Sequence, residues 1–190
     1  MADGSPIEVL STVPATTRSV RWVGRKSVEY DLACEDWAIA GVALRDRVAA
    51  RWGVPDPPPE LTPLSAEDPA AAVAAIRRLL GEAAPDFDDG RVALLVCPID
   101  RDLACRALSA RVVTGPDTVE WQDVGWQVTY EPFVPEPDEY GPLLSFRFER
   151  GQYEEVVRAR LDRYRAAVVD QPHGTDAATE PRRRPWFRRR

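Results

Sequence analysis

The stretch RVALLVC, residues 91–97, carries an uninterrupted apolar run of strand length. Such a run predicts the most buried strand of a sheet. Further strands are expected after it, at 107–113, 118–130 and 143–150, with a turn at 114–117. An antiparallel meander is the simplest assembly of these four strands.

The segment 118–130 ends in a clean alternation of side chains. Trp126, Val128 and Tyr130 fall on one face, and polar residues fall on the other. Because apolar and polar residues alternate along a half-buried strand, we expect Trp126 and Tyr130 to face the core.

The N-terminal third is predicted to contain strands followed by a helix. Residues 18–32 favour two short strands or a hairpin around GRK, and 7–13 favours an edge strand that Pro14 stops. Apolar residues at helical spacing predict a helix from Glu35 to Trp52, which ends at Gly53.

Two more helices are expected beyond a proline-rich connector at 54–64. The first ends at Gly81 and begins either with a capping box of Ser65 and Asp68 or with Asp68 as the cap before Pro69. The last covers 151–169. Glu154 is expected to pair with Arg158 on its outer face. Its buried stripe comprises Tyr153, Val156, Val157, Leu161, Tyr164 and Val168.

These elements predict an α+β fold, a mostly antiparallel sheet of about five to six strands with three helices packed on one side. Residues 1–169 are expected to form a single domain. Residues 170–190 are expected to be a disordered linker and an arginine-rich tail, because 170–180 holds only small and polar side chains.

Composition excludes several kinds of site. The net charge is -6, and Lys26 is the one lysine among 25 basic residues, which we interpret as the codon bias of a GC-rich bacterial genome. With one histidine, His173, and three scattered cysteines, zinc sites and histidine triads are not expected, nor is any metal or other cofactor. The cysteines are expected to be buried free thiols. The N-terminus does not resemble a secretory signal, so the predicted location is cytoplasmic.

An enzymatic interpretation rests on CPIDRD at 97–102. Asp100 and Asp102 follow the apolar strand beside Cys97, where carboxylates orient a cation or a water. The plainer interpretation is that the two aspartates begin a turn and that Cys97 is inert. The acidic turn at 86–90 lacks the spacing of a calcium loop and is interpreted as a solvated turn.

A stretch without Lys or Arg lies between Arg111 and Arg147. It holds seven carboxylates together with the aromatic residues Trp121, Trp126, Tyr130, Phe133 and Tyr140. Carboxylates and aromatic faces both bind guanidinium groups, so this stretch predicts a contact surface for a cationic protein. The candidate residues are Asp117, Glu120, Asp123, Glu131, Phe133, Glu136, Asp138, Glu139 and Tyr140.

The last ten residues concentrate positive charge, whereas residues 1–169 carry a net charge of -9. Arginines around a Trp-Phe pair suit an anionic membrane surface or nucleic acid, and the tail has the charge to fold back on the acidic stretch. A tail without a role remains the plain interpretation. The anchor residues are Arg182, Arg183, Arg184, Trp186, Phe187, Arg188, Arg189 and Arg190.

The function expected from these features is that of a non-enzymatic protein-binding module, by analogy of charge an inhibitor or immunity type of protein. The first alternative is a small enzyme that uses Asp100 and Asp102 near Cys97. The second is a peripheral membrane adaptor that binds through the tail.

Overall fold

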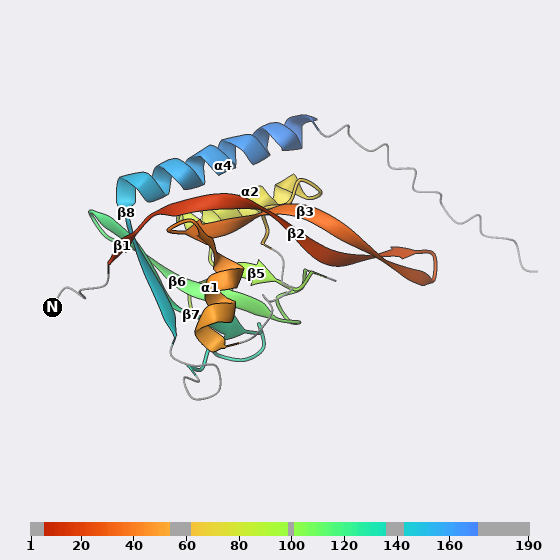
Figure 1. Cartoon of the computed structure of the whole chain (residues 1–190), viewed down its shortest axis with the longest axis horizontal. Coiled ribbons are helices and arrows are strands. Elements are labelled where there is room, and N and C mark those ends of the chain that lie inside the picture. Colours follow the sequence, from red (N-terminus) through yellow and green to blue (C-terminus); the bar gives the residue numbers. More distant parts are fainter. Residues whose placement is uncertain (1–5, 54–61, 99–100, 136–142, 171–190) are drawn as a thin grey trace, which may run out of the picture.

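The computed structural model describes residues 6–53, 62–98, 101–135 and 143–170, and it has the predicted α+β class (Figure 1). The described residues form two sheets. The larger has the order β1-β8-β7-β6-β5 and the smaller β2-β3-β4. All neighbouring strands are antiparallel except β1 and β8. The strands are β1 (Ile7–Glu8), β2 (Leu10–Val23), β3 (Lys26–Ile39), β4 (Val42–Ala43), β5 (Arg91–Val96), β6 (Ala107–Thr114), β7 (Thr118–Gln127) and β8 (Leu144–Glu149).

The predicted meander is confirmed as β5 to β8, and every residue of β5 is buried. β7 ends earlier than expected, at Gln127, so Val128 and Tyr130 lie beyond the strand. The prediction that Tyr130 faces the core is wrong, because its side chain is 70% exposed. Trp126 is half-buried and packs against the main core.

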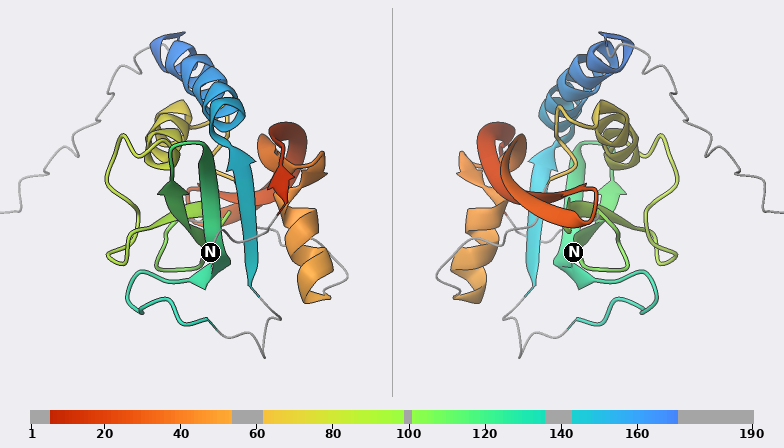
Figure 2. Two further views of the ribbon diagram at one scale, coloured as in Figure 1. Left: turned by 90° about the vertical axis from the view of Figure 1, so that its left-hand side faces the viewer. Right: turned by 90° about the vertical axis from the view of Figure 1, so that its right-hand side faces the viewer.

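The helices are α1 (Leu44–Trp52), α2 (Pro69–Leu79) and α4 (Arg150–Asp170). α2 and α4 pack against each other on the large sheet, whereas α1 lies apart beside the smaller sheet (Figure 2). All three helices nevertheless contribute to one main core with the large sheet: Leu44 and Val48 from α1, Ile76 from α2, and Tyr153 and Val157 from α4. No helix in the described ranges is long and apolar enough to cross a bilayer.

The N-terminal hairpin is much longer than predicted, and it replaces the first half of the predicted helix. β2 and β3 pair over 14 residues each, and the segment that includes Trp37 is the end of β3. Residues 36–39 are all buried, so the two-residue alternation that marks a strand disappears there. Ala40 and Gly41, both with positive φ, turn the chain before α1 begins.

Pro14 does not stop a strand, contrary to the prediction, but lies within β2 opposite Glu35. The backbone N–H and C=O of Leu10 bond to the Gln152 side chain, on the side of β2 away from β3. Strand geometry directs the backbone of Pro14, four residues later, the same way. Its missing N–H therefore falls on the open edge and costs no ladder hydrogen bond.

The start of α2 follows the second of the two predicted caps. The Asp68 side chain accepts from Ala71 N at 3.0 Å, and Pro69 is the first helical residue. Ser65 instead accepts from Glu67 N at 3.2 Å. Gly81, with φ 70°, ends the segment as predicted.

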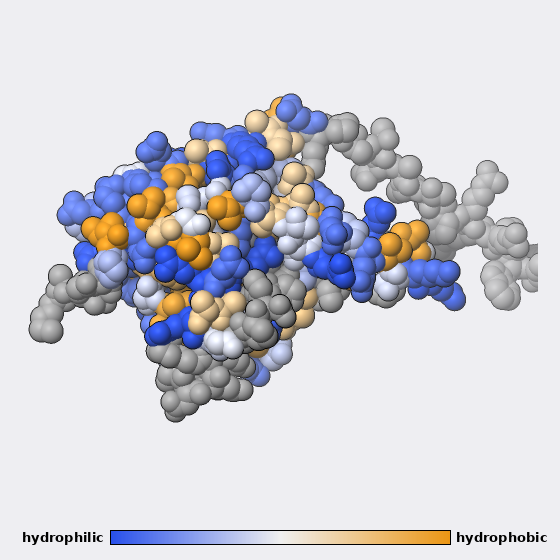
Figure 3. Space-filling model, in the orientation of Figure 1, coloured by the Kyte–Doolittle hydropathy of each residue, from blue (hydrophilic) through white to orange (hydrophobic). Residues whose placement is uncertain are grey.

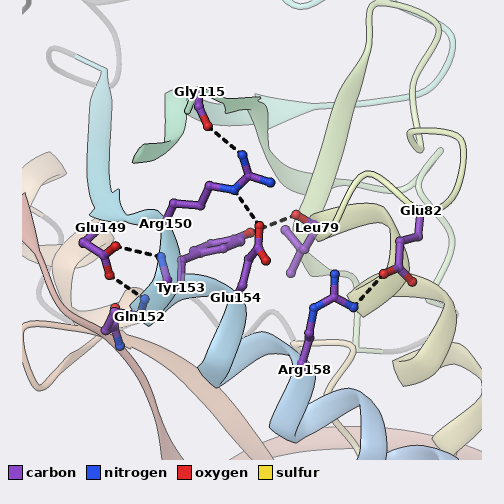
Figure 4. Close-up of polar contacts among 10 residues, drawn as sticks. Leu79, Glu82, Gly115, Glu149, Arg150, Gln152, Tyr153, Glu154 and Arg158 are labelled. Carbon is purple, nitrogen blue, oxygen red and sulfur yellow. Dashed lines mark hydrogen bonds and ion pairs between the residues drawn. The ribbon is translucent and has the colours of Figure 1, made fainter. Parts of the chain in front are cut away.

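The last helix is anchored at its first turn (Figure 4). The Glu149 carboxylate accepts from the backbone N–H groups of Gln152 at 2.6 Å and Gly151 at 2.9 Å, and these bonds lower the pKa of Glu149. Buried Tyr153 donates to Leu79 O on α2 at 3.1 Å, which ties the two helices together. Its burial raises the pKa of the phenol.

The predicted stripe of α4 is buried at Tyr153, Val157, Leu161 and Tyr164, while Val168 is 39% exposed. The predicted pair of Glu154 with Arg158 is wrong. Glu154 accepts from Arg150 at 2.7 Å, and Arg158 reaches Glu82 beyond α2 at 2.9 Å (Figure 4). Tertiary neighbours thus replace the expected pair within the helix.

Several predictions fall on residues outside the described ranges. These are the connector at 54–61, Asp100, the segment 136–142 and the tail at 171–190, while Asp170 closes α4. Cys34 and Cys97 are buried free thiols as expected, but Cys105 is exposed, because it lies in the turn after Asp102.

Candidate functional site

The predicted acidic and aromatic residues do not gather in one place. Asp117 precedes β7, and Glu131 and Phe133 follow it. A ten-residue strand spans about 30 Å at 3.3 Å per residue, so Asp117 and Glu131 lie near opposite ends of the sheet. Asp123 is in the middle of β7. Glu136, Asp138, Glu139 and Tyr140 lie outside the described residues.

The fold supplies counter-charges that the stretch itself lacks. Arg147 on β8 lies opposite Glu120 on β7, and their side chains approach to 3.5 Å. The guanidinium carbon of Arg91 lies 3.5 Å from the ring centroid of Phe133. The aromatic surface expected for an external cation is therefore occupied, at Phe133, by an arginine of the same chain.

Arg91 is the centre of a buried polar network on the large sheet. Its side chain donates to Ser109 Oγ at 2.9 Å, to Ser109 O at 2.8 Å and to Asp123 O at 2.6 Å. Ser109 donates to Gln127 Oε1 at 2.9 Å, and Gln127 donates to Asp89 Oδ2 at 2.9 Å. Burial lowers the pKa of Arg91 to about 10, an effect that the charges of Asp89 and Asp123 oppose.

A bulge in β7 places one of these acceptors. The pairing of β7 shifts with both β6 and β8 near Asp123, whose φ is 52°. Aspartate tolerates this left-handed conformation better than most residues. Bulges bend a strand and re-aim its groups, and here the bulge directs Asp123 O toward Arg91.

Gly125 permits the close approach of Phe133 to the sheet. A Cβ atom at Gly125 would lie 2.7 Å from Phe133 Cε2 and 2.8 Å from Cζ, closer than real contacts. The glycine thus lets the Phe133 ring approach β7 beside Arg91. This contact between Gly125 and Phe133 couples the conformation of the loop at 128–135 to the sheet.

Gly125→Ala is expected to lower the free energy of unfolding by about 1–3 kcal/mol, because the added methyl group overpacks the contact and displaces Phe133. Gly115→Ala is the matched control, since its Cβ would come no closer than 3.4 Å to Thr118 O. Urea unfolding of both variants measures the difference. Equal losses would contradict this account of Gly125.

An acidic pocket lies between the turn at 86–90 and the segment 127–132. It encloses about 250 Å³ and is lined by Phe87, Asp88, Asp89, Gln127, Thr129, Tyr130, Glu131 and Pro132. Phe87 packs on β5 and β6, and Gln127 holds Asp89, so the turn is fixed over the end of β7. Tyr130, another of the lining residues, is 70% exposed.

Sequence reasoning missed Asp88, Asp89 and Tyr130 as members of one site. Asp88 and Tyr130 are about forty positions apart, and no local pattern links them. The tertiary contact of Gln127 with Asp89 brings their segments together. Glu131 is the one predicted residue that the pocket includes.

A second hollow of about 300 Å³ adjoins the same segment; it includes Phe133 and shares Gln127, Glu131 and Pro132 with the acidic pocket. Trp52 and Trp126 form one wall, with ring centroids 5.9 Å apart. The Arg106 guanidinium lies 4.3 Å from the Trp126 centroid. This hollow therefore presents aromatic rings and a cation, with Glu131 as its one carboxylate.

Of the predicted enzymatic site, the structure describes Cys97 and Asp102, whereas Asp100 lies outside the described residues. Asp102 Oδ1 accepts from Ala104 N at 2.9 Å and begins a turn. Arg101 points to Asp68 and Glu67, at 3.4 and 3.7 Å. Cys97 is buried, and the described residues contain no cluster suited to a metal ion.

Comparison with protein-family models, with curated proteins and with solved structures finds no match to this chain.

Proposed function

We propose that the protein is a non-enzymatic protein-binding module that receives a cationic side chain of its partner in the acidic pocket. The observation that carries the proposal is the 70% exposed ring of Tyr130 beside the carboxylates of Glu131, Asp88 and Asp89. None of the described side chains that line this pocket is basic.

The chemistry of the pocket fits a guanidinium group. An aromatic face attracts a cation by about 0.5–1 kcal/mol at an exposed site, and carboxylates accept its N–H donors in pairs. The volume of about 250 Å³ is below the usual range of small-molecule pockets, about 300–1,000 Å³, so a single side chain fits better than a metabolite.

Charge over the whole chain supports a basic partner. Residues 1–169 carry a net charge of -9, which attracts a basic protein before contact and raises the rate of encounter. Inhibition of a basic protein is one activity that such a module performs. The arginine-rich tail is then either an accessory anchor or a competitor for the same pocket.

The test is a calorimetric titration with the peptide PRRRPWFRRR, which reproduces residues 181–190, in about 0.1 M salt. The Asp88→Asn/Glu131→Gln variant is expected to bind about tenfold more weakly, since two exposed ion pairs contribute about 0.5–1 kcal/mol each. Tyr130→Ala should weaken binding by about threefold.

The matched control is Asp117→Asn/Glu155→Gln, which removes the same charge away from the acidic pocket. It should retain the affinity within about twofold. Because the tail can occupy the pocket in cis, the titration is repeated with a chain that ends at Glu180. If the pocket variant and the control weaken binding equally in both chains, the attraction is non-specific and the proposal fails.

A further inference from the structure

The hairpin of β2 and β3 continues past the body as an arm (Figure 1). Its contacts with the body include Ser19 Oγ, which donates to Pro98 O at 2.6 Å, and Tyr30 OH, which donates to Glu67 at 2.9 Å. Beyond them Val23 is 58% and Val28 40% exposed. Figure 3 shows a small hydrophobic patch among hydrophilic residues at the projecting end.

The outer edge of β3 is satisfied near the body and open along the arm. Glu35 N donates to Leu64 O at 2.9 Å, and Glu35 O accepts from Thr62 Oγ1. Because a strand repeats every two residues, the backbone groups of Ser27, Glu29, Asp31 and Ala33 point the same way. No described strand pairs with this side of β3 between residues 26 and 33.

The two edges of the arm differ in their protection against pairing. The open edge of β2 carries Pro14, and Arg18 and Arg21 are the only charged residues of that strand. Two copies of β2 would therefore bring like charges together. β3 has no proline and no register shift, and along its open part, residues 26–33, its charges have both signs: Lys26, Glu29 and Asp31.

We propose that the open edge of β3 is a self-association surface, on which a second copy of this chain pairs antiparallel about a twofold axis at Val28. Val28 then meets Val28 of the second copy, and Lys26 meets its Tyr30. Ser27 and Glu29 exchange backbone hydrogen bonds with Glu29 and Ser27 of the second copy. Arg25, in the turn, comes opposite its Asp31.

Charge selects this register over its neighbours. An axis at Glu29 or at Asp31 sets a carboxylate against itself, and an axis at Tyr30 sets Glu29 against Asp31. The axis at Val28 avoids these contacts and joins the exposed valines. A two-stranded ribbon is marginal in water, so the four-stranded ribbon also stabilises the arm. The surface is small, and the association is correspondingly weak.

The decisive experiment is disulfide trapping of Val28→Cys in a full-length Cys105→Ser background, which removes the exposed native thiol. Cα atoms of a non-hydrogen-bonded antiparallel pair are about 4.5 Å apart, within the disulfide range. Under mild oxidation this variant should form a covalent dimer at least about tenfold faster than Val23→Cys, the control on β2. Circular dichroism confirms that both variants fold.

A charge reversal in the turn gives a second variant. Arg25→Asp in the Val28→Cys chain sets a new carboxylate against Asp31 of the second copy and should slow trapping about fivefold, whereas Arg25→Lys should not. Equal trapping at positions 23 and 28, or none at either, overturns the proposal. If a strand of another protein or a nucleic acid occupies this edge instead, Val28→Cys should not form the covalent dimer. The inference does not depend on the acidic pocket, because none of its residues lies on the arm.

Discussion

Replacing Arg91 with alanine is expected to lower the free energy of unfolding by about 3 kcal/mol. The substitution leaves three buried or half-buried acceptors, Ser109 Oγ, Ser109 O and Asp123 O, without their charged donor. An orphaned buried acceptor costs about 1–3 kcal/mol, and removal of the side chain under Phe133 adds a cavity.

Removal of Arg91 also has a smaller, stabilising effect, because it removes an unfavourably buried charge. Burial lowers the pKa of Arg91 to about 10, so the folded chain holds this charge less readily than the unfolded chain does. Alanine relieves that penalty, which keeps the net loss near 3 kcal/mol instead of the larger sum of its parts.

Arg111→Ala is the control, because Arg111 is the exposed cross-strand neighbour of Arg91 on β6. It should cost less than about 1 kcal/mol. Denaturant unfolding followed by tryptophan fluorescence compares the two variants. A loss for Arg91→Ala no larger than that for Arg111→Ala would show that the network does not hold the sheet and loop together.

Asp36→Asn is expected to cost about 3–5 kcal/mol, because it leaves the buried guanidinium of Arg45 without its counter-charge. Arg45 Nε lies 3.0 Å from Asp36 Oδ2, and the residues are 7% and 1% exposed. Breaking a buried pair on one side is far more damaging than replacing both partners.

A double-mutant cycle with Arg45→Met tests this prediction. Asp36→Asn/Arg45→Met should recover at least half of the loss, which gives a coupling energy of about 2–3 kcal/mol. Additive losses would contradict the account of the pair.

Burial disfavours the charge of Arg45, but the Asp36 carboxylate more than offsets this effect and raises the pKa of Arg45. The carboxylate therefore stabilises the buried guanidinium, and Asp36→Asn removes this contribution.

Elements with strong local signals were predictable. β5 is an apolar run, α2 begins with Asp68 and Pro69, and α4 repeats apolar residues along one face. The end of β3 was not predictable, because residues 36–39 are buried on both faces and lose the alternation of a strand. The prediction that Pro14 stops a strand was wrong because the sequence does not show which edge of the strand its nitrogen faces; only the strand pairing shows this.

The candidate site was predictable in kind but not in place. Carboxylates and aromatics between Arg111 and Arg147 indicated a cation, yet the fold covers Phe133 with Arg91 and pairs Glu120 with Arg147. The exposed ring is instead that of Tyr130. The alternating pattern predicted that Tyr130 faces the core, because it did not reveal that β7 ends at Gln127. Asp88 and Asp89 join it through contacts that no local pattern encodes.

The central claim is that the acidic pocket recognises a cationic side chain, and one ratio tests it most directly. This is the affinity of the arginine peptide for the Asp117→Asn/Glu155→Gln control divided by its affinity for Asp88→Asn/Glu131→Gln. We predict a ratio of about ten, from the loss of two ion pairs in a single pocket. A ratio of about one, in both the full chain and the chain that ends at Glu180, would contradict it.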